Sequence, residues 1–110
     1  MSSVLNREQL REVTMDDEDL MREIVSALID DTSKQIPLLE VAIREGDPVK
    51  CARLAHYSKG ACANVGAESA ADLLRHIEQR AHGGDFQECS VSLAALAYEI
   101  GRLRSLAAEL

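Results

Sequence analysis

Residues 56–67 read HYSKGACANVGA, and the interpretation of the whole chain starts from this stretch. Its composition is that of a helix, yet position 60 holds a glycine, which costs a helix interior about 1 kcal/mol relative to alanine. Gly66 follows later, and a glycine just past the last helical residue is a common helix stop. The stretch therefore predicts a helix that ends at about Val65 and has an open surface at Gly60.

The two faces of this helix differ in character. Because each helical residue turns by about 100°, His56 and Gly60 fall nearly opposite the predicted core side, with Lys59 beside them. The neighbours of His56 are small, namely Ala52 and Ala63, so the imidazole is expected to stand on a shallow exposed surface that a partner can approach closely. The residues predicted to face the core are Cys51, Leu54, Ser58, Ala61, Cys62 and Val65.

Two helices are predicted before this stretch. Asn6 and the glutamine three residues later have the spacing of a capping box, which predicts a short helix at about 7–13. A longer helix is predicted from about Asp16, in an acidic run that suits the positive end of a helix dipole, to the GDP sequence at 46–48. Because Pro37 lies inside this range, a kink or a short break is expected around residues 32–37.

The remaining helices follow from their cap residues. Asp47 followed by Pro48 predicts the start of the helix that carries the opening stretch. The next helix is predicted at about 69–82, stopped by the glycine pair at 83–84. The last is predicted to begin after Asp85 and to continue to the end of the chain. Four substantial helices with short connections favour an all-α fold, an antiparallel up-down-up-down four-helix bundle with a short extra N-terminal helix.

Length and composition narrow the class of protein. A chain of 110 residues with 46% apolar content and no tryptophan predicts one helical domain over 1–110, with the bundle at about 16–110. The net charge of −7 argues against a nucleic acid partner. No apolar run has the ~18 residues of a membrane span, and no signal peptide is recognisable. Three cysteines outside paired motifs indicate reduced thiols and a cytoplasmic location, and a monomer is expected.

The exposed His56 predicts phosphoryl transfer chemistry. A neutral imidazole is a nucleophile near physiological pH, and phosphohistidine can pass its phosphoryl group on. Lys59 lies within reach of a group on the ring, where a charge-assisted hydrogen bond contributes about 1.5 to 3 kcal/mol. No phosphate-binding loop, nucleophile elbow or paired catalytic carboxylate is visible, so an independent kinase or hydrolase is not expected. His76 and His82 do not have the spacing of metal ligands.

The segment AHYSKGACANVGA at 55–67 resembles the motif of the histidine-containing phosphotransfer (HPt) domain family of two-component phosphorelays. That motif has His, two residues, Lys-Gly, five residues and then Gly. The resemblance extends over most of the chain, because AIREGD at 42–47 precedes the motif and LLRHIE at 73–78 follows it as in the family. It implies a four-helix bundle that carries a phosphoryl group without intrinsic kinase activity.

The resemblance also implies roles for individual residues. His56 would be phosphorylated on its distal ring nitrogen, Lys59 would be the electrostatic partner of the phosphoryl group, and Gly60 would provide the clearance that admits a receiver domain. In some members a polar side chain of the next helix binds the imidazole. An ungapped count places Glu78 there, and Gln79 if the register slips by one. A carboxylate would orient the ring but would also repel a nearby phosphoryl group.

The partners implied by the resemblance are a receiver domain and a sensor or hybrid histidine kinase. The receiver would supply the acceptor aspartate and a magnesium ion, so no cofactor or metal is expected in this chain. Arg53 and Tyr57, with Ala52 and Ala63, are candidate docking residues. The leading interpretation is a carrier that accepts a phosphoryl group on His56 and relays it to or from receiver aspartates. The alternatives are a helical module that regulates a receiver or kinase without phosphotransfer, and the phosphoacceptor domain of a larger kinase.

Overall fold

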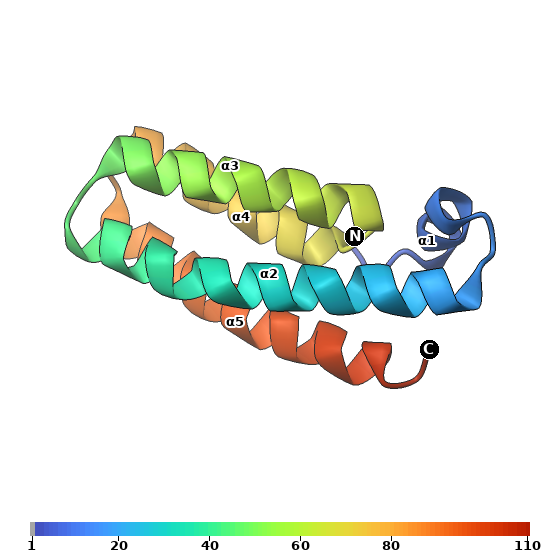
Figure 1. The fold of residues 1–110 in the computed structure, drawn as a ribbon. Helices are drawn as coiled ribbons and strands as arrows, with labels where there is room; N and C mark the ends of the chain where they lie inside the picture. Colours follow the sequence, from blue (N-terminus) through green and yellow to red (C-terminus); the bar gives the residue numbers. More distant parts are fainter. Residues whose placement is uncertain (1) are drawn as a thin grey trace.

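The computed structural model describes residues 2–110, and these form five helices and no strand (Figure 1). Each of the four long helices contacts its two neighbours, so that α2, α3, α4 and α5 follow one another around the bundle and alternate in direction. This confirms the predicted all-α bundle with a short N-terminal helix. The helices are α1 (Arg7–Thr14), α2 (Glu18–Arg44), α3 (Pro48–Val65), α4 (Glu68–His82) and α5 (Phe86–Ala107).

Side-chain caps fix the starts of three of the long helices. Asp47 and Asp85 each accept a hydrogen bond from the backbone N–H three residues later, at 3.0 and 3.2 Å. Asp17 caps α2 in the same way at 3.1 Å. Asp16, the predicted start, instead lies in the preceding turn with a left-handed φ of 61°, and α2 therefore begins two residues later than predicted.

The helix α2 continues through Pro37, so the alternative of a break at 32–37 is wrong. Proline removes the hydrogen bond to the carbonyl of Ser33 and costs a helix about 3 kcal/mol. Pro37 lies on the exposed side of α2, whereas buried residues on both sides of it belong to the same core. These residues anchor both halves of the helix in the bundle, and they are Leu28, Ile29, Leu39 and Ala42.

The described residues share one hydrophobic core between the helices. All three cysteines are free and fully buried, which confirms Cys51 and Cys62 as core residues. Burial raises the pKa of the Cys51 thiol to about 12 and that of Cys62 to about 11. None of the helices is both long and apolar enough to span a bilayer within residues 2–110.

The N-terminal strap, residues 2–6, lies against the turn between α3 and α4. The backbone N–H of Asn6 donates to the carbonyl oxygen of Gly66 at 2.7 Å. The Asn6 side chain accepts from the backbone N–H of Gln9 at 3.1 Å, as a capping box requires. The Gln9 side chain does not return to Asn6, because its amide donates to the carbonyl of Ala63 at 2.6 Å. This contact ties α1 to the C-terminal end of α3.

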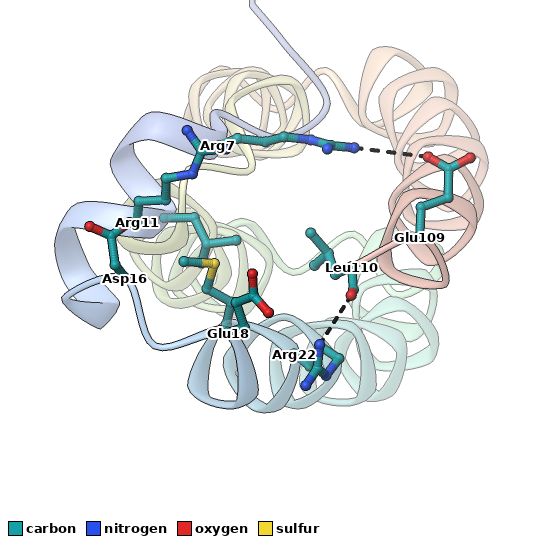
Figure 2. Close-up of a pocket in the computed structure, with 9 residues that line it drawn as sticks. Arg7, Arg11, Asp16, Glu18, Arg22, Glu109 and Leu110 are labelled. Atoms are coloured by element: carbon teal, nitrogen blue, oxygen red, sulfur yellow. Dashed lines mark hydrogen bonds and ion pairs between the residues drawn. The ribbon is translucent and has the colours of Figure 1, made fainter.

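One end of the bundle is covered by α1, and Figure 2 looks into the hollow at that end. Arg7 of α1 reaches across the hollow, where its Nη2 lies 3.9 Å from Oε2 of Glu109. Arg22 of α2 donates through Nη1 to the carbonyl oxygen of Leu110 at 3.1 Å. Both contacts join segments far apart in the sequence, so the short helix and the last residues together close this end of the core.

Replacing Gly66 by alanine should destabilise the protein by about 1 to 3 kcal/mol. Gly66 has a left-handed φ of 95°, and an added Cβ would lie 2.9 Å from the backbone oxygen of Asn6 in the strap. Gly60 is the matched control, because a Cβ there meets nothing within 4 Å. Gly60→Ala should stabilise the helix by about 0.5 to 1 kcal/mol. Urea unfolding of both variants checks this, and a loss at Gly60 as large as at Gly66 would contradict it.

Candidate functional site

The site lies along the groove between α3 and α4, the two helices with the most extensive contact. His56 and Lys59 stand one turn apart on α3, and Glu78 of α4 lies against both of them. Nδ1 of His56 lies 3.0 Å from Oε2 of Glu78. Nζ of Lys59 donates to the other carboxylate oxygen, Oε1, at 2.8 Å. The carboxylate of Glu78 therefore joins the two α3 side chains that the sequence singled out.

This contact decides which nitrogen of the imidazole carries the proton. A carboxylate only accepts hydrogen bonds, so Nδ1 of His56 must be the N–H donor. In the neutral ring Nε2 then has no proton and keeps its lone pair. The His56 side chain is 68% exposed, whereas Glu78 is only 19% exposed. Glu78 therefore holds the ring on its Nδ1 side, and the nucleophilic Nε2 is left on the exposed part of the ring.

Glu78 is held in its charged form. The hydrogen bond from Lys59 and the charges of Lys59 and His56 lower the pKa of the Glu78 carboxyl, and they outweigh the burial that would raise it. The site at neutral pH therefore contains a carboxylate between two nitrogen donors. The Lys59 ammonium is thereby fixed close to the ring, with two further N–H donors that Glu78 does not use.

The other residues predicted for this face lie around His56. Gly60 faces open space, with nothing within 4 Å of the position of an added Cβ. Arg53, Tyr57 and Ala63 are exposed. Tyr57 is 57% exposed, which is high for a large side chain. A partner approaching His56 would therefore meet small and amphipathic side chains on α3.

The structure corrects the predicted exposure of Ala52 and distinguishes between the two candidate partners of the His56 ring. The sequence predicts Ala52 on the shallow exposed surface around His56, but its exposed fraction is only 6%. Ala52 lies about 40° around the axis of α3 from His56, on the side that packs on α4. This packing buries more of the α3 surface than the predicted core face. Of the two candidate imidazole partners, Glu78 contacts the ring and Gln79 is exposed.

Two shallow hollows flank the site along the groove. The first lies toward the start of α3, and His82 of α4 lines it together with Val49 and Ala52. The second lies beside Lys59 and Gly60, and its rim includes Gln9. Sequence reasoning missed His82 and Gln9 in these positions. His82 could have been found, because it lies four residues after Glu78 on the same face of α4, but Gln9 could not, since nothing in the sequence places α1 beside α3.

No three or more His, Cys, Asp or Glu side chains in the described part of the chain are grouped so that they could hold a metal ion. His76 lies on the exposed surface of α4, and His82 is exposed at its end.

Glu78→Gln should make the free energy of unfolding less dependent on pH between pH 7 and pH 2. A carboxyl whose pKa is lowered by folding stabilises the native state above its ordinary pKa of 4.5, and this contribution is lost as the pH falls through the lowered value. At pH 7 the variant should lose about 0.5 to 1 kcal/mol, and near pH 2 it should match the wild type. Urea unfolding at both pH values measures this. A constant difference between the two proteins from pH 7 to pH 2 would contradict the lowered pKa.

Comparison with known proteins gives a family and a fold. The model of the Hpt domain matches residues 23–106 of the chain. The structure resembles histidine-containing phosphotransfer protein B from Pseudomonas aeruginosa, with a TM-score of 0.89 and 22% identity over 99% of this chain and 95% of that one. It also resembles a histidine-containing phosphotransfer protein from maize, with a TM-score of 0.82 and 23% identity over 93% and 78% of the two chains. No curated protein sequence matches the chain.

Proposed function

Because the chain belongs to the Hpt domain family, we propose that His56 is its phosphorylated residue and that Nε2 is the atom that takes the phosphoryl group. The chain is a histidine-containing phosphotransfer domain of phosphorelay signalling, and such domains are phosphoryl carriers rather than kinases. The observation that carries the assignment to His56 is its contact with Glu78. The 3.0 Å contact at Nδ1 leaves Nε2 unprotonated on an exposed ring.

The proposed transfer step uses this arrangement directly. The Nε2 lone pair attacks the phosphorus of an aspartyl phosphate in a receiver domain and forms the N–P bond. The P–O bond to the aspartate breaks, and the aspartate leaves as a carboxylate. The proton stays on Nδ1, so the ring gains positive charge as the N–P bond forms. The ionised Glu78 beside Nδ1 stabilises that charge, which favours the transition state.

Lys59 and Gly60 have complementary roles in this proposal. The free N–H donors of Lys59 bind the oxygens of the phosphoryl group and offset part of their repulsion by Glu78. The bare surface at Gly60, together with the exposed Arg53, Tyr57 and Ala63, lets a receiver domain bring its aspartate to His56. Ala52 contributes to docking only through the small area it exposes in the hollow beside His56. A sensor or hybrid histidine kinase is the other class of partner, placed at the start of the relay.

We propose further that residues 1–110 act as one Hpt domain and work as a monomer. A single chain holds His56, Lys59 and Glu78 in contact, so the proposed step needs no second copy of the chain. The three buried free thiols fit a reducing compartment, which supports a cytoplasmic location for the relay.

Incubation with a phosphorylated receiver domain tests the assignment of His56. The wild type should gain one phosphoryl group that is labile in acid and stable in alkali, and His56→Gln should gain none. Lys59→Ala should slow transfer about 10-fold to 100-fold, because it removes one charge-assisted hydrogen bond. Intact mass and gel labelling follow the reaction.

His76→Gln is the matched control, because it removes an exposed histidine outside the site. Label that persists in His56→Gln would overturn the assignment. If several receivers bind the wild type and none labels it, the chain is instead a regulatory binding module.

Gly60→Ala should separate stability from function. The added methyl group should stabilise α3, as argued above, yet it should slow transfer from the receiver by reducing the clearance beside His56. The expected slowing is about 3-fold to 10-fold, with a larger loss for Gly60→Leu. Stopped-flow transfer rates measured alongside urea unfolding give both quantities. Wild-type transfer rates in Gly60→Leu would show that the receiver does not approach over Gly60.

A further inference from the structure

Glu99 is a buried acidic residue in the middle of α5 that the proposed phosphotransfer does not use. It is only 7% exposed and lies among core residues of the same helix. Oε1 accepts from Nη1 of Arg102 at 3.0 Å. Oε2 is fully buried and has no hydrogen-bond partner in the described structure. A buried carboxylate oxygen without a hydrogen-bond partner destabilises the folded state. A bound ligand that donates to Oε2 would remove this cost.

A surface hollow adjoins this carboxylate between α4 and α5. We call it the Glu99 hollow, and Asp72 and Ser69 of α4 and Tyr98 of α5 line it together with Glu99. Asp72 adds a second carboxylate, whose Oδ1 is paired with Arg75 at 2.9 Å and whose Oδ2 accepts from the Ser2 hydroxyl. Ser2 also lines the hollow, and the Ser69 hydroxyl donates to its carbonyl oxygen at 3.1 Å. Tyr98 is 72% exposed and borders the hollow with an aromatic ring. The hollow thus combines two carboxylates, a hydroxyl and an aromatic ring.

We propose that the Glu99 hollow binds a primary ammonium group, from a lysine side chain of a partner protein or from a free amine. The ammonium has three N–H donors, and Oε2 of Glu99 is an acceptor without a partner. The Asp72 carboxylate and the Ser69 oxygen keep further lone pairs beside their bonds to Arg75 and Ser2, and these supply the other two acceptors. The terminal torsion of a glutamate is broad, and in the proposed complex the carboxylate turns so that the buried Oε2 faces the hollow while Arg102 stays on Oε1. A cation above the Tyr98 ring gains further attraction.

Other cations fit the hollow less well. A divalent metal ion needs more oxygen ligands than two carboxylates and a hydroxyl provide, and no metal-binding group is found within residues 2–110. A guanidinium group prefers a carboxylate whose two oxygens are both accessible, whereas Oε1 of Glu99 is already taken by Arg102. The compact ammonium group needs only one free oxygen of Glu99.

The Glu99 hollow adjoins the phosphotransfer site, because Asp72 and Ser2 line both this hollow and the hollow beside Lys59 and Gly60. The His56 groove lies between α3 and α4, while the Glu99 hollow lies between α4 and α5. The two share α4, but Glu99 and Tyr98 belong to a helix that contributes nothing to the contacts of His56. An ammonium group beside Glu99 therefore uses residues that the proposed transfer step does not use, on a surface next to the hollow at Gly60.

Titration followed by ¹H–¹⁵N NMR of the full chain tests the proposal. The probe is lysine capped at both backbone ends, and its Nε-acetylated form is the matched neutral control. The charged probe should give saturable shifts confined to about residues 69–73 and 95–99, with a Kd of about 1 to 10 mM for a fragment of this size. The acetylated probe should give none. Absence of saturable shifts, or equal shifts with both probes, overturns the proposal.

Variants and a second probe identify the contacts and the source of the amine. Glu99→Gln should weaken binding at least 10-fold, and Tyr98→Ala should weaken it less. Glu88→Gln removes an exposed carboxylate of the same helix and should change the Kd by less than twofold. Glu99→Gln with a wild-type Kd overturns the proposal. Spermidine that binds at least 10-fold tighter than capped lysine supports a free polyamine as the ligand, and similar or weaker binding supports a protein lysine.

Discussion

The left-handed turn at Gly66 is the constraint on which the rest of the structure depends. It ends α3 and sends α4 back along it, and this return path determines which residue of α4 meets His56. The carbonyl of Gly66 also accepts the backbone N–H of Asn6 at 2.7 Å, so the N-terminal strap is fixed by the same turn. A side chain at this position would collide with that strap. One glycine therefore sets both the register of the functional groove and the position of α1.

The electrostatics of the groove favour a carrier over a store of phosphate. In the proposed reaction Glu78 stabilises the positive charge that the ring gains, but its own negative charge repels the phosphoryl oxygens. Lys59 offsets that repulsion only in part, because it is already bound to the carboxylate at 2.8 Å. The phosphorylated state is therefore held by balanced opposing interactions. In the proposed mechanism a group held in this way leaves readily when a receiver aspartate is presented, as relay to a receiver requires.

The sequence predicted the elements better than it predicted their contacts. Asp47 and Asp85 revealed where two helices begin, because an N-cap acts on its own next turn. Pro37 misled only as to a break in the helix, because its cost is local whereas the packing that overrides it comes from other helices. A helical-wheel projection of α3 placed His56 on the outward face correctly but also predicted an exposed Ala52. Such a projection describes one helix and does not include the neighbouring helix that covers Ala52. Gln9 binding to α3 lay beyond sequence reasoning for the same reason.

Gly60 and Glu99 are two positions where the sequence departs from what stability alone would select. Gly60 weakens a helix at a point where alanine would fit without contact. Glu99 places a carboxylate oxygen without a partner in the core, where an apolar residue would pack at lower cost. Departures of this kind tend to mark functional sites in otherwise consistent sequences. The hollows beside these two residues meet at Asp72, so the physical argument that leads from Gly60 to a docking receiver leads from Glu99 to a second binding site next to it.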